Sequence, residues 1–520
     1  MVFERIYYLR RENNMTQEEL AEKSGVSRQA IQKWETGQSA PTIDNLVKLS
    51  ELFNVTLDYL CKDIAGDNAR VDTDKKYKLN YEKYVGAYFG TLDIEYAQCF
   101  DEGKDVAQYK ELFMSVKKMP NDEYKGRIAD VIFDMVNRLP QRADFDFFEP
   151  NDLTTIRLQR EKTEKIDGFE RSLLSDKMKG GWYGRICGCL LGKPVELMVF
   201  NELEKVLKRT NNYPIYRYIT AEEVADIDTD DISFPIKVRA YSKNLGVMPS
   251  DDDTNYMLIA YETLKRHGRD FTSDDIAEVW TTTQTYNAYC SAEYIAYTNI
   301  IAGYTPPASG EYKNAYREWV GAQIRGDVWG YVNPGNTEKA AEMAWRDARV
   351  SHVKNGIYGE MWVSAMIAAA YTTRDIKTII KAGLGEIPRS SRLHKAINGI
   401  IGKYESGMSA DECFADIRLR WNEKFKHHWC HVISNAEIVA AALLYGEGDY
   451  GKSICLAVGT AFDTDCNGAT VGSVLGVALG FEKLPKVWVD QINDTLISTL
   501  SGYEKVSVKD IAEKTLGYIG

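Results

Sequence analysis

Apolar residues recur at helical spacing through the first sixty positions, and short polar turns separate the runs. Leu20 and Trp34 lie on the apolar faces of two successive predicted helices. Thr16 and Glu19 have the spacing of a capping box, and Gly25 permits the tight turn that follows. The pattern predicts five helices in residues 1–63. The first helix has Leu9 on its apolar face, and the third begins at the cap Ser27 and ends at Gly37. The fourth runs from Thr42 through Phe53, and the fifth begins at Thr56.

The next part of the chain changes character twice. Residues 64–75 are polar and without periodicity, which predicts a linker. Residues 76–139 return to helical spacing and are dense in aromatic residues, which we interpret as core and interface side chains because basic residues do not regularly interleave with them. These aromatic residues are Tyr77, Tyr81, Tyr84, Tyr88 and Phe89. Residues 64–147 are thus a linker and helical connector that either belongs to the larger domain or mediates dimer contacts.

Two later helices are each preceded by carboxylates. Asp251–Asp253 stand before an apolar helical run that ends at Gly268, and Asp463 and Asp465 open a helix of small residues. One acidic residue is expected there, because a helix N-terminus attracts negative charge. Three in a row exceed that need, although a solvated acidic cap remains an alternative.

Glycines recur at every fourth position in two segments. Such spacing puts them on one helical face, where another helix can approach closely, so plain helix packing is the simplest interpretation. After the first segment, Pro194 ends the helix and leaves Glu196 in the following loop. The glycines are Gly180, Gly184, Gly188 and Gly192 in one segment and Gly468, Gly472, Gly476 and Gly480 in the other.

Composition narrows the class of protein. A chain of 520 residues predicts two or three domains, and 44% hydrophobic with 27% charged residues is typical of soluble proteins. The net charge of -12 argues against a chain built wholly around nucleic acid but allows a small DNA-binding module. Residues 1–14 do not resemble a signal peptide, and no apolar run is long enough for a membrane span. The nine cysteines are scattered, which fits reduced thiols in a cytoplasmic protein.

Three histidines cluster in the segment HHWCH. They are His427, His428 and His431, and they could form part of a metal site. No second cluster with ligand spacing is evident, so a packed or solvated segment is the favoured interpretation.

The first domain resembles the Cro/C1-type (XRE) helix-turn-helix family over nearly all of residues 1–63. By this resemblance residues 27–36 form the recognition helix, and Gln17 starts the preceding helix, where the family usually contacts phosphate. Glutamine can pair with adenine and arginine with guanine. The residues expected to contact a double-stranded DNA operator are Gln17, Arg28, Gln29, Gln32 and Lys33. The module is not strongly basic, so a possible homodimer would strengthen binding; a helical bundle used only for dimerisation is the alternative.

The two acidic segments could bind cations together if the fold brings them close in space. Hard divalent cations such as Mg²⁺ need oxygen ligands, and two ions close together need several carboxylates. Repulsion between the two acidic segments would then become affinity for cations.

The acidic segments and the helix ending in Pro194-Val195-Glu196 together resemble the ADP-ribosylglycohydrolase family (the DraG/ARH type), from about Phe148 to residue 520. The resemblance implies an all-α domain with two Mg²⁺ or Mn²⁺ ions, and a Glu196 that lies on a loop over the substrate. The implied metal ligands are Asp251, Asp252, Asp253, Asp463, Asp465 and Cys466, and the implied catalytic residues are Glu196, Asp252 and Asp465. Which carboxylate is the acid or base stays open.

Two positions depart from the family pattern. Asp251 replaces a hydroxyl residue and adds a carboxylate. Cys466 also replaces a hydroxyl residue, and a thiol is a poor ligand for a hard ion. His352 is a candidate substrate-binding residue, with a core histidine as the equal alternative. Residues 325–336, with aromatic residues expected at the surface, are a candidate loop for substrate phosphate or adenine.

The implied function is a metal-dependent glycohydrolase that cleaves ADP-ribose from an ADP-ribosylated acceptor, coupled to sequence-specific DNA binding. One alternative is a transcriptional regulator whose glycohydrolase-like domain senses ADP-ribose or an NAD-derived ligand. Another is a nucleoside or nucleotide N-glycosidase.

Overall fold

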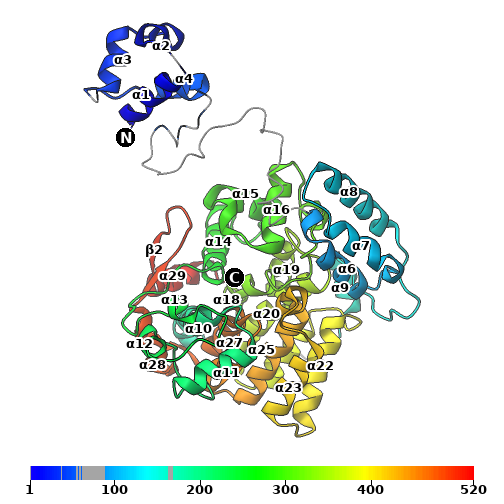
Figure 1. The fold of residues 1–520 in the computed structure, drawn as a ribbon. Helices are drawn as coiled ribbons and strands as arrows, with labels where there is room; N and C mark the ends of the chain where they lie inside the picture. The colour runs from blue at the N-terminus through cyan, green and yellow to red at the C-terminus, as the bar shows by residue number, and fades with distance from the viewer. Residues whose placement is uncertain are drawn as a thin grey trace. The chain divides into compact units, whose positions relative to one another are not determined.

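The computed structural model describes residues 2–13, 15–36, 38–53, 55, 57, 60, 88–161 and 168–520. The chain forms two compact units, residues 1–87 with 121–123 and residues 88–120 with 124–520 (Figure 1). The predicted linker at 64–75 and the aromatic residues Tyr77, Tyr81 and Tyr84 lie outside the described residues.

The first unit contains the predicted helix-turn-helix. The capping box of Thr16 and Glu19 is present, and Gly25 has the left-handed backbone (φ 69°) that the turn needs. Leu20 and Ile31 are fully buried between the helices. The predicted helix end at Gly37 and helix start at Thr56 lie outside the described residues. The helices are α1 (Val2–Glu12), α2 (Gln17–Ser24), α3 (Arg28–Glu35) and α4 (Ile43–Phe53).

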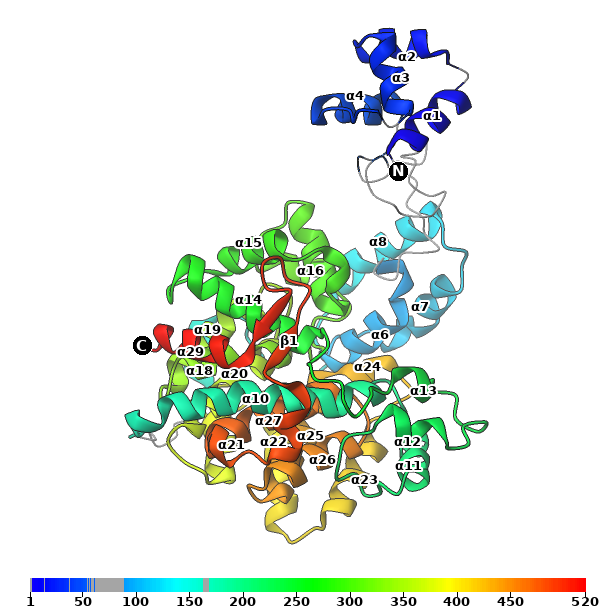
Figure 2. The ribbon, with the colours of Figure 1, turned by 90° about the vertical axis from the view of Figure 1, so that its left-hand side faces the viewer.

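Residues 88–520 are all-α, which confirms the predicted fold class (Figures 1 and 2). A two-stranded antiparallel hairpin, β1 (Thr495–Ile497) with β2 (Lys505–Ser507), is the sheet of the described residues. The α-helices are α6 (Leu92–Asp101), α7 (Lys110–Lys117), α8 (Glu123–Arg138), α9 (Leu153–Gln159), α10 (Leu174–Gly192), α11 (Phe200–Arg209), α12 (Ala221–Ala225), α13 (Ile236–Arg239), α14 (Asp252–His267), α15 (Ser273–Thr283), α16 (Ser291–Ile301), α17 (Ala308–Glu311), α18 (Asp327–Tyr331), α19 (Thr337–Ala348), α20 (Asn355–Ala370), α21 (Ile376–Leu384), α22 (Arg392–Glu405), α23 (Ala410–Arg420), α24 (Lys426–Cys430), α25 (Val432–Gly446), α26 (Tyr450–Gly459), α27 (Thr464–Leu479), α28 (Lys486–Val489) and α29 (Val508–Thr515).

Short 3₁₀ turns connect many of these helices. They are η1 (Tyr88–Gly90), η2 (Ala107–Tyr109), η3 (Arg171–Leu173), η4 (Lys193–Val195), η5 (Tyr286–Ala288), η6 (Gln323–Arg325), η7 (Phe481–Lys483), η8 (Asp490–Ile492) and η9 (Leu516–Tyr518).

The core of this unit lies around α20 and α25, which are buried along their whole lengths. Most of their residues are apolar, as expected of helices enclosed by other helices, and the few polar side chains, such as Glu360 and Asn435, are buried as well. Figure 2 shows α25 among α22, α26 and α27.

The connector helices α6, α7 and α8 lie, except for Glu123, in the same compact unit as the remainder of residues 88–520. Tyr88 and Phe89 are buried, in line with their interpretation as packed aromatic residues. Arg317 joins α6 to this unit through Glu95 (2.8 Å) and Glu102 (2.6 Å). We call the following buried ion pairs the paired network: Arg317 with Glu95 and Glu102, and Arg392 with Glu149 and Glu318.

The two glycine-rich helices are each other's partners. α10 and α27 pack in opposite directions, so that the predicted close approach occurs between them (Figure 2). A methyl group on Gly180, Gly184 or Gly188 would overlap the backbone carbonyl of the glycine opposite. The register is Gly180 with Gly476, Gly184 with Gly472, Gly188 with Gly468, and Gly192 with Thr464. This pairing brings the end of α10 to the start of α27, where both carry candidate site residues.

No helix of the described residues is both long and apolar enough to cross a membrane.

Candidate active site

Three segments that are remote in sequence converge on one buried place. Asp251 caps α14, Asp463 precedes α27, and Glu196 follows η4 at the end of α10. The hydroxyl of Thr464 donates to the carbonyl of Gly192 (2.9 Å), which ties the second segment to the third. We call the carboxylates of Glu196, Asp251, Asp252, Asp253, Asp463 and Asp465 the acidic cluster.

Asp251 is balanced by a cation that the sequence did not reveal. One of its carboxylate oxygens accepts from the backbone N–H of Asp253 (2.9 Å), and the other is bonded to Nζ of Lys193. Burial lowers the pKa of Lys193, but the charge of Asp251 outweighs it and raises that pKa above its usual range. The carboxylate that is extra to the family pattern is therefore engaged as a cap and an ion pair.

Asp253 is paired on one side only. Arg185 of α10, fully buried, donates to Oδ1 of Asp253 (2.5 Å) and pairs with Asp327 (3.0 Å). Oδ2 of Asp253 is buried and has no hydrogen-bond partner among the described residues. Burial raises the pKa of Asp253 well above its ordinary value, and the charges of Asp251 and Asp463 add to this against the effect of Arg185.

The other aspartates show the same excess of negative charge. Burial and the charges of Asp251 and Asp253 raise the pKa of Asp252, and burial with Glu196 raises the pKa of Asp463 to about 7. Burial also raises the pKa of Asp465, whose Oδ1 is buried without a partner in the described structure. A cation at this place would relieve both the repulsion and the unmet hydrogen bonding.

Several thiols lie close to the acidic cluster, among them those of Cys189, Cys430 and Cys466. Burial and the charge of Asp253 raise the pKa of Cys466 well above its usual range when no metal ion is bound. Sγ of Cys430 lies 3.9 Å from Oδ2 of Asp463. One ligand atom each from Asp253, Asp465 and Cys466 lie within 4.8 Å of one another, and the role of Cys466 as a metal ligand stays a prediction, since a thiol is a poor ligand for a hard ion.

Glu196 lies at the rim of the cluster. Its side chain is 29% exposed and pairs with Arg239 (3.0 Å). Its charge contributes to the raised pKa of Asp252, Asp463 and Asp465, so it lies within electrostatic reach of all three.

His352 is fully buried away from these contacts. Its Nδ1 bonds to the hydroxyl of Ser351 (2.8 Å) and lies 3.8 Å from Glu293. Burial, followed by the charge of Arg325, lowers the pKa of His352 well below its usual value, so the ring is neutral. Among the described residues no hydrogen bond or ion pair joins His352 to the acidic cluster, which favours the core alternative.

The expectation that the aromatic residues of 325–336 lie at the surface was wrong. Trp329 and Tyr331 are fully buried. The indole N–H of Trp329 donates to Asp347 (3.0 Å) and Glu360 (3.1 Å), and the hydroxyl of Tyr331 bonds to Ser473 (2.6 Å). Polar partners in other helices satisfy these rings, and a single sequence does not show such partners.

The sequence pattern also missed the cations Arg185 and Lys193. A signal for Lys193 existed, since it stands three residues before Glu196 in the same motif. Arg185 lies between the glycines of α10, a position that packing alone would not assign to a charged residue.

The predicted recognition helix α3 presents its polar face. Arg28, Gln29, Gln32 and Lys33 are exposed. The side-chain amide of Gln17, where a phosphate contact is expected, donates to Oε2 of Glu35 (2.7 Å) inside the domain, and the phosphate contact stays a prediction. The partners of Glu35 in this internal network are Arg10 and Gln17.

Comparisons with known proteins divide the chain in the same way. A model of the ADP-ribosylglycohydrolase family matches residues 170–517, and a helix-turn-helix model matches residues 6–60. A solved chain titled "ADP-ribosylglycohydrolase-related protein complex" is similar with a TM-score of 0.44 and 16% identity, over 67% of this chain and 100% of that chain.

The curated relatives match the N-terminal part. The HTH-type transcriptional activator BcrR of Enterococcus faecalis is 36% identical over 91 residues, which are 18% of this chain and 43% of BcrR, so the chain spans less than half of that relative. The uncharacterized HTH-type transcriptional regulator YqaE of Bacillus subtilis (strain 168) is 30% identical over 98 residues, 19% of this chain and 84% of YqaE. Because the glycohydrolase model covers more than half of the chain, this protein belongs to the ADP-ribosylglycohydrolase family and carries an N-terminal helix-turn-helix domain.

Proposed function

We propose that the large domain is a metal-dependent glycohydrolase that cleaves ADP-ribose from an ADP-ribosylated acceptor. The observation that carries the proposal is the convergence of remote carboxylates at one buried place, with oxygens of Asp253 and Asp465 left without partners. Buried groups with strongly shifted pKa values concentrate at functional sites, since stability alone would favour apolar or paired residues there.

The donor set fits two hard divalent ions, Mg²⁺ or Mn²⁺. Asp252, Asp253, Asp463 and Asp465 would hold them, because carboxylate oxygens are the ligands that these ions prefer. Asp251 fits less well, since both of its oxygens are engaged. When bound, such ions orient ribose hydroxyls and lower the pKa of a water molecule.

Three residues of the chain would take part in the hydrolysis, each in a different role. Hydrolysis forms a bond from a water oxygen to C1 of the ribose and breaks the bond from C1 to the acceptor. Glu196, at the exposed rim and oriented by Arg239, takes the proton from water or delivers one to the leaving group. Asp252 and Asp465 stabilise the positive charge that develops on the ribose ring.

Turnover of an ADP-ribosylated peptide, with Mg²⁺ and after metal removal, tests this proposal. Asp465→Asn should remove most activity and metal binding without unfolding the protein, and Glu196→Gln should lower kcat by about 100-fold or more. The exposed Glu405→Gln on α22 is the matched control and should keep full activity. Metal-stripped protein that cleaves as fast as loaded protein would contradict the mechanism.

A second candidate is a regulator that senses ADP-ribose or an NAD-derived ligand without turnover. The ion pairs of Lys193 and Arg185 favour it, because they already neutralise part of the acidic cluster. Tight binding of ADP-ribose combined with no cleavage of Arg-linked, Ser-linked or nucleic-acid-linked substrates would select this candidate.

For the first domain we propose binding of double-stranded DNA through α3. Its exposed glutamines and basic residues suit base edges and phosphates. Replacing Gln29 and Lys33 with alanine should weaken operator binding by at least about tenfold in a mobility-shift assay. Lys23→Ala on α2 is the matched control, and equal loss in both variants would place the contact elsewhere.

A further inference from the structure

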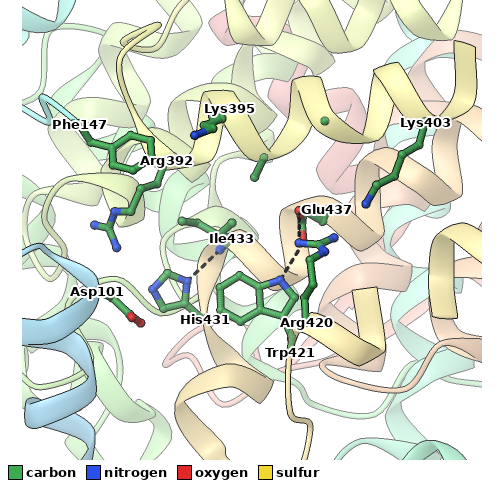
Figure 3. A pocket seen from close by; sticks show the side chains of 12 residues that line it. Asp101, Phe147, Arg392, Lys395, Lys403, Arg420, Trp421, His431, Ile433 and Glu437 are labelled. Carbon is green, nitrogen blue, oxygen red and sulfur yellow. Dashed lines mark hydrogen bonds and ion pairs between the residues drawn. The ribbon is translucent and has the colours of Figure 1, made fainter. Parts of the chain in front are cut away.

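A cavity of about 430 Å³ lies outside the acidic cluster. Its walls come from α6, the segment before α9, α22, the loop after α23 and α25 (Figure 3). The lining residues include Asp101, Phe147, Lys395, Trp421, His431 and Ile433. Asp101 and Phe147 precede residue 170, so this cavity uses a part of the chain that the family model does not cover.

Asp101, His427 and His431 bring ligand atoms within 4.8 Å of one another, which invites comparison with a metal site. The ring nitrogens argue otherwise. Nδ1 of His427 accepts from the indole N–H of Trp319 (3.2 Å), so the proton of the neutral ring lies on Nε2, which donates to Asp101 (2.9 Å).

His431 is held in the same tautomer. The backbone N–H of Ile433 donates to its Nδ1 (3.1 Å), which puts the proton of the neutral ring on Nε2. A metal-bound histidine would instead donate from its second nitrogen. Nε2 of His431 is buried and has no hydrogen-bond partner among the described residues. The cluster therefore offers an N–H donor, not a pair of metal ligands.

The donor stands beside an acceptor. Asp101 lines the same cavity with a carboxylate that is 30% exposed. Figure 3 shows the imidazole of His431 and the carboxylate of Asp101 on the same side of the cavity. A bound group that matches both must accept a hydrogen bond at one atom and donate one from an adjacent atom.

The remaining walls suit a flat ring. The indole of Trp421 lies nearly parallel to the imidazole of His431, with centroids 5.6 Å apart and planes at 20°. Phe147 and Ile433 add apolar surface, and Lys395 lies over the ring of Phe147 (5.2 Å). The cations Arg392 and Arg420 are already paired with carboxylates, which argues against a site built for a multiply charged anion.

We propose that this cavity binds a planar ring with a carboxamide-like edge, in which an acceptor takes the Nε2–H of His431 and a neighbouring N–H donates to Asp101. Aryl carboxamides and adenine share this edge. The site is independent of the proposed hydrolysis and of the acidic cluster.

Calorimetric titration of the full chain with benzamide, adenine and benzoate tests the proposal. Benzamide or adenine should bind at least tenfold more tightly than benzoate, because a carboxylate has no N–H for Asp101. Binding of benzamide alone identifies a carboxamide ligand, and binding of adenine alone identifies a nucleobase. Benzoate binding that equals or exceeds both, or no binding of either, overturns the proposal.

Two variants sharpen the test. His431→Phe keeps a flat ring but removes the donor, and should weaken the preferred ligand by about tenfold. Asp101→Asn can still accept from His427 while turning an N–H toward the cavity, so it should reverse the preference towards benzoate. If His431→Phe does not fold, Asp101→Asn alone tests the proposal. Asp465→Asn is the control and should leave these affinities unchanged. The assignment would be contradicted if His431→Phe bound the ligand as tightly as the unchanged protein, or if Asp101→Asn did not come to prefer benzoate. A loss of affinity in Asp465→Asn would also contradict it.

Discussion

The paired network and the acidic cluster both hold carboxylates away from water, yet their pKa values move in opposite directions. Glu102 and Glu318 are buried, but Arg317 and Lys354 beside Glu102, and Arg392 beside Glu318, hold both pKa values below their usual range. In the acidic cluster burial and neighbouring acids raise the pKa of Asp252, Asp253 and Asp465.

The difference lies in how the charges are held. In the paired network two arginines bridge four glutamates, so the charges themselves join α6 to the rest of its unit. In the acidic cluster Lys193 and Arg185 balance only part of the charge, and the packing of α10 against α27 keeps the carboxylates together. The first arrangement is stable as it stands, and the second is suited to receiving positive charge.

Breaking the paired network should have the largest effect. Arg392→Met leaves Glu149 and Glu318 buried with too few partners and should lower the free energy of unfolding by about 3–5 kcal/mol. Denaturant titration measures it. Lys377→Met, at the exposed pair with Glu405, is the control and should change stability by no more than about 0.5 kcal/mol. Similar losses in both would mean that burial does not distinguish the pairs.

The pH dependence of stability should separate the two regions in metal-free protein. The raised pKa of Asp463, about 7, means that its favourable contribution is complete near pH 4 and is lost as pH rises to about 7, by on the order of 2–4 kcal/mol. The lowered pKa values of Glu102 and Glu318 mean that their contribution is complete above about pH 5 and is lost as pH falls.

Thermal unfolding at several pH values after metal removal checks this. Stability should fall from pH 5 to 7. Asp463→Asn should reduce that slope, to which the raised pKa values of Asp252, Asp253 and Asp465 also contribute, while leaving the loss below pH 4. A slope that Asp463→Asn does not change would assign the pH dependence to another group.

The smallest effect tests packing as the agent that holds the acidic cluster. A methyl group at Gly188 meets the backbone of α27, so Gly188→Ala should cost about 1–3 kcal/mol. Gly402 on α22 has open space around it, so Gly402→Ala should be neutral or stabilising by up to about 1 kcal/mol. Equal effects in urea unfolding would show that the close approach contributes nothing.

Local signals in the sequence predicted much of this structure. The cap at Thr16, the turn at Gly25 and the glycine faces of α10 and α27 follow from spacing, and the structure has all three. The sequence alone did not predict which residues these features contact, because such contacts join segments that are remote in sequence. Lys193 against Asp251 and Glu35 against Gln17 are such contacts, and neither follows from the spacing of residues along the chain.

The pairing of glycines between α10 and α27 also fixes how far the two helices extend past one another. Because the glycines repeat every four residues, a slip of one helix along the other by four positions, about 6 Å, would again place most glycines of α10 opposite glycines of α27. The same slip would carry Glu196 away from Asp465. Insertion of four residues upstream of Gly192 would therefore leave a well-packed helix pair whose candidate site residues no longer meet, so the length of α10 sets the distance between Glu196 and Asp465.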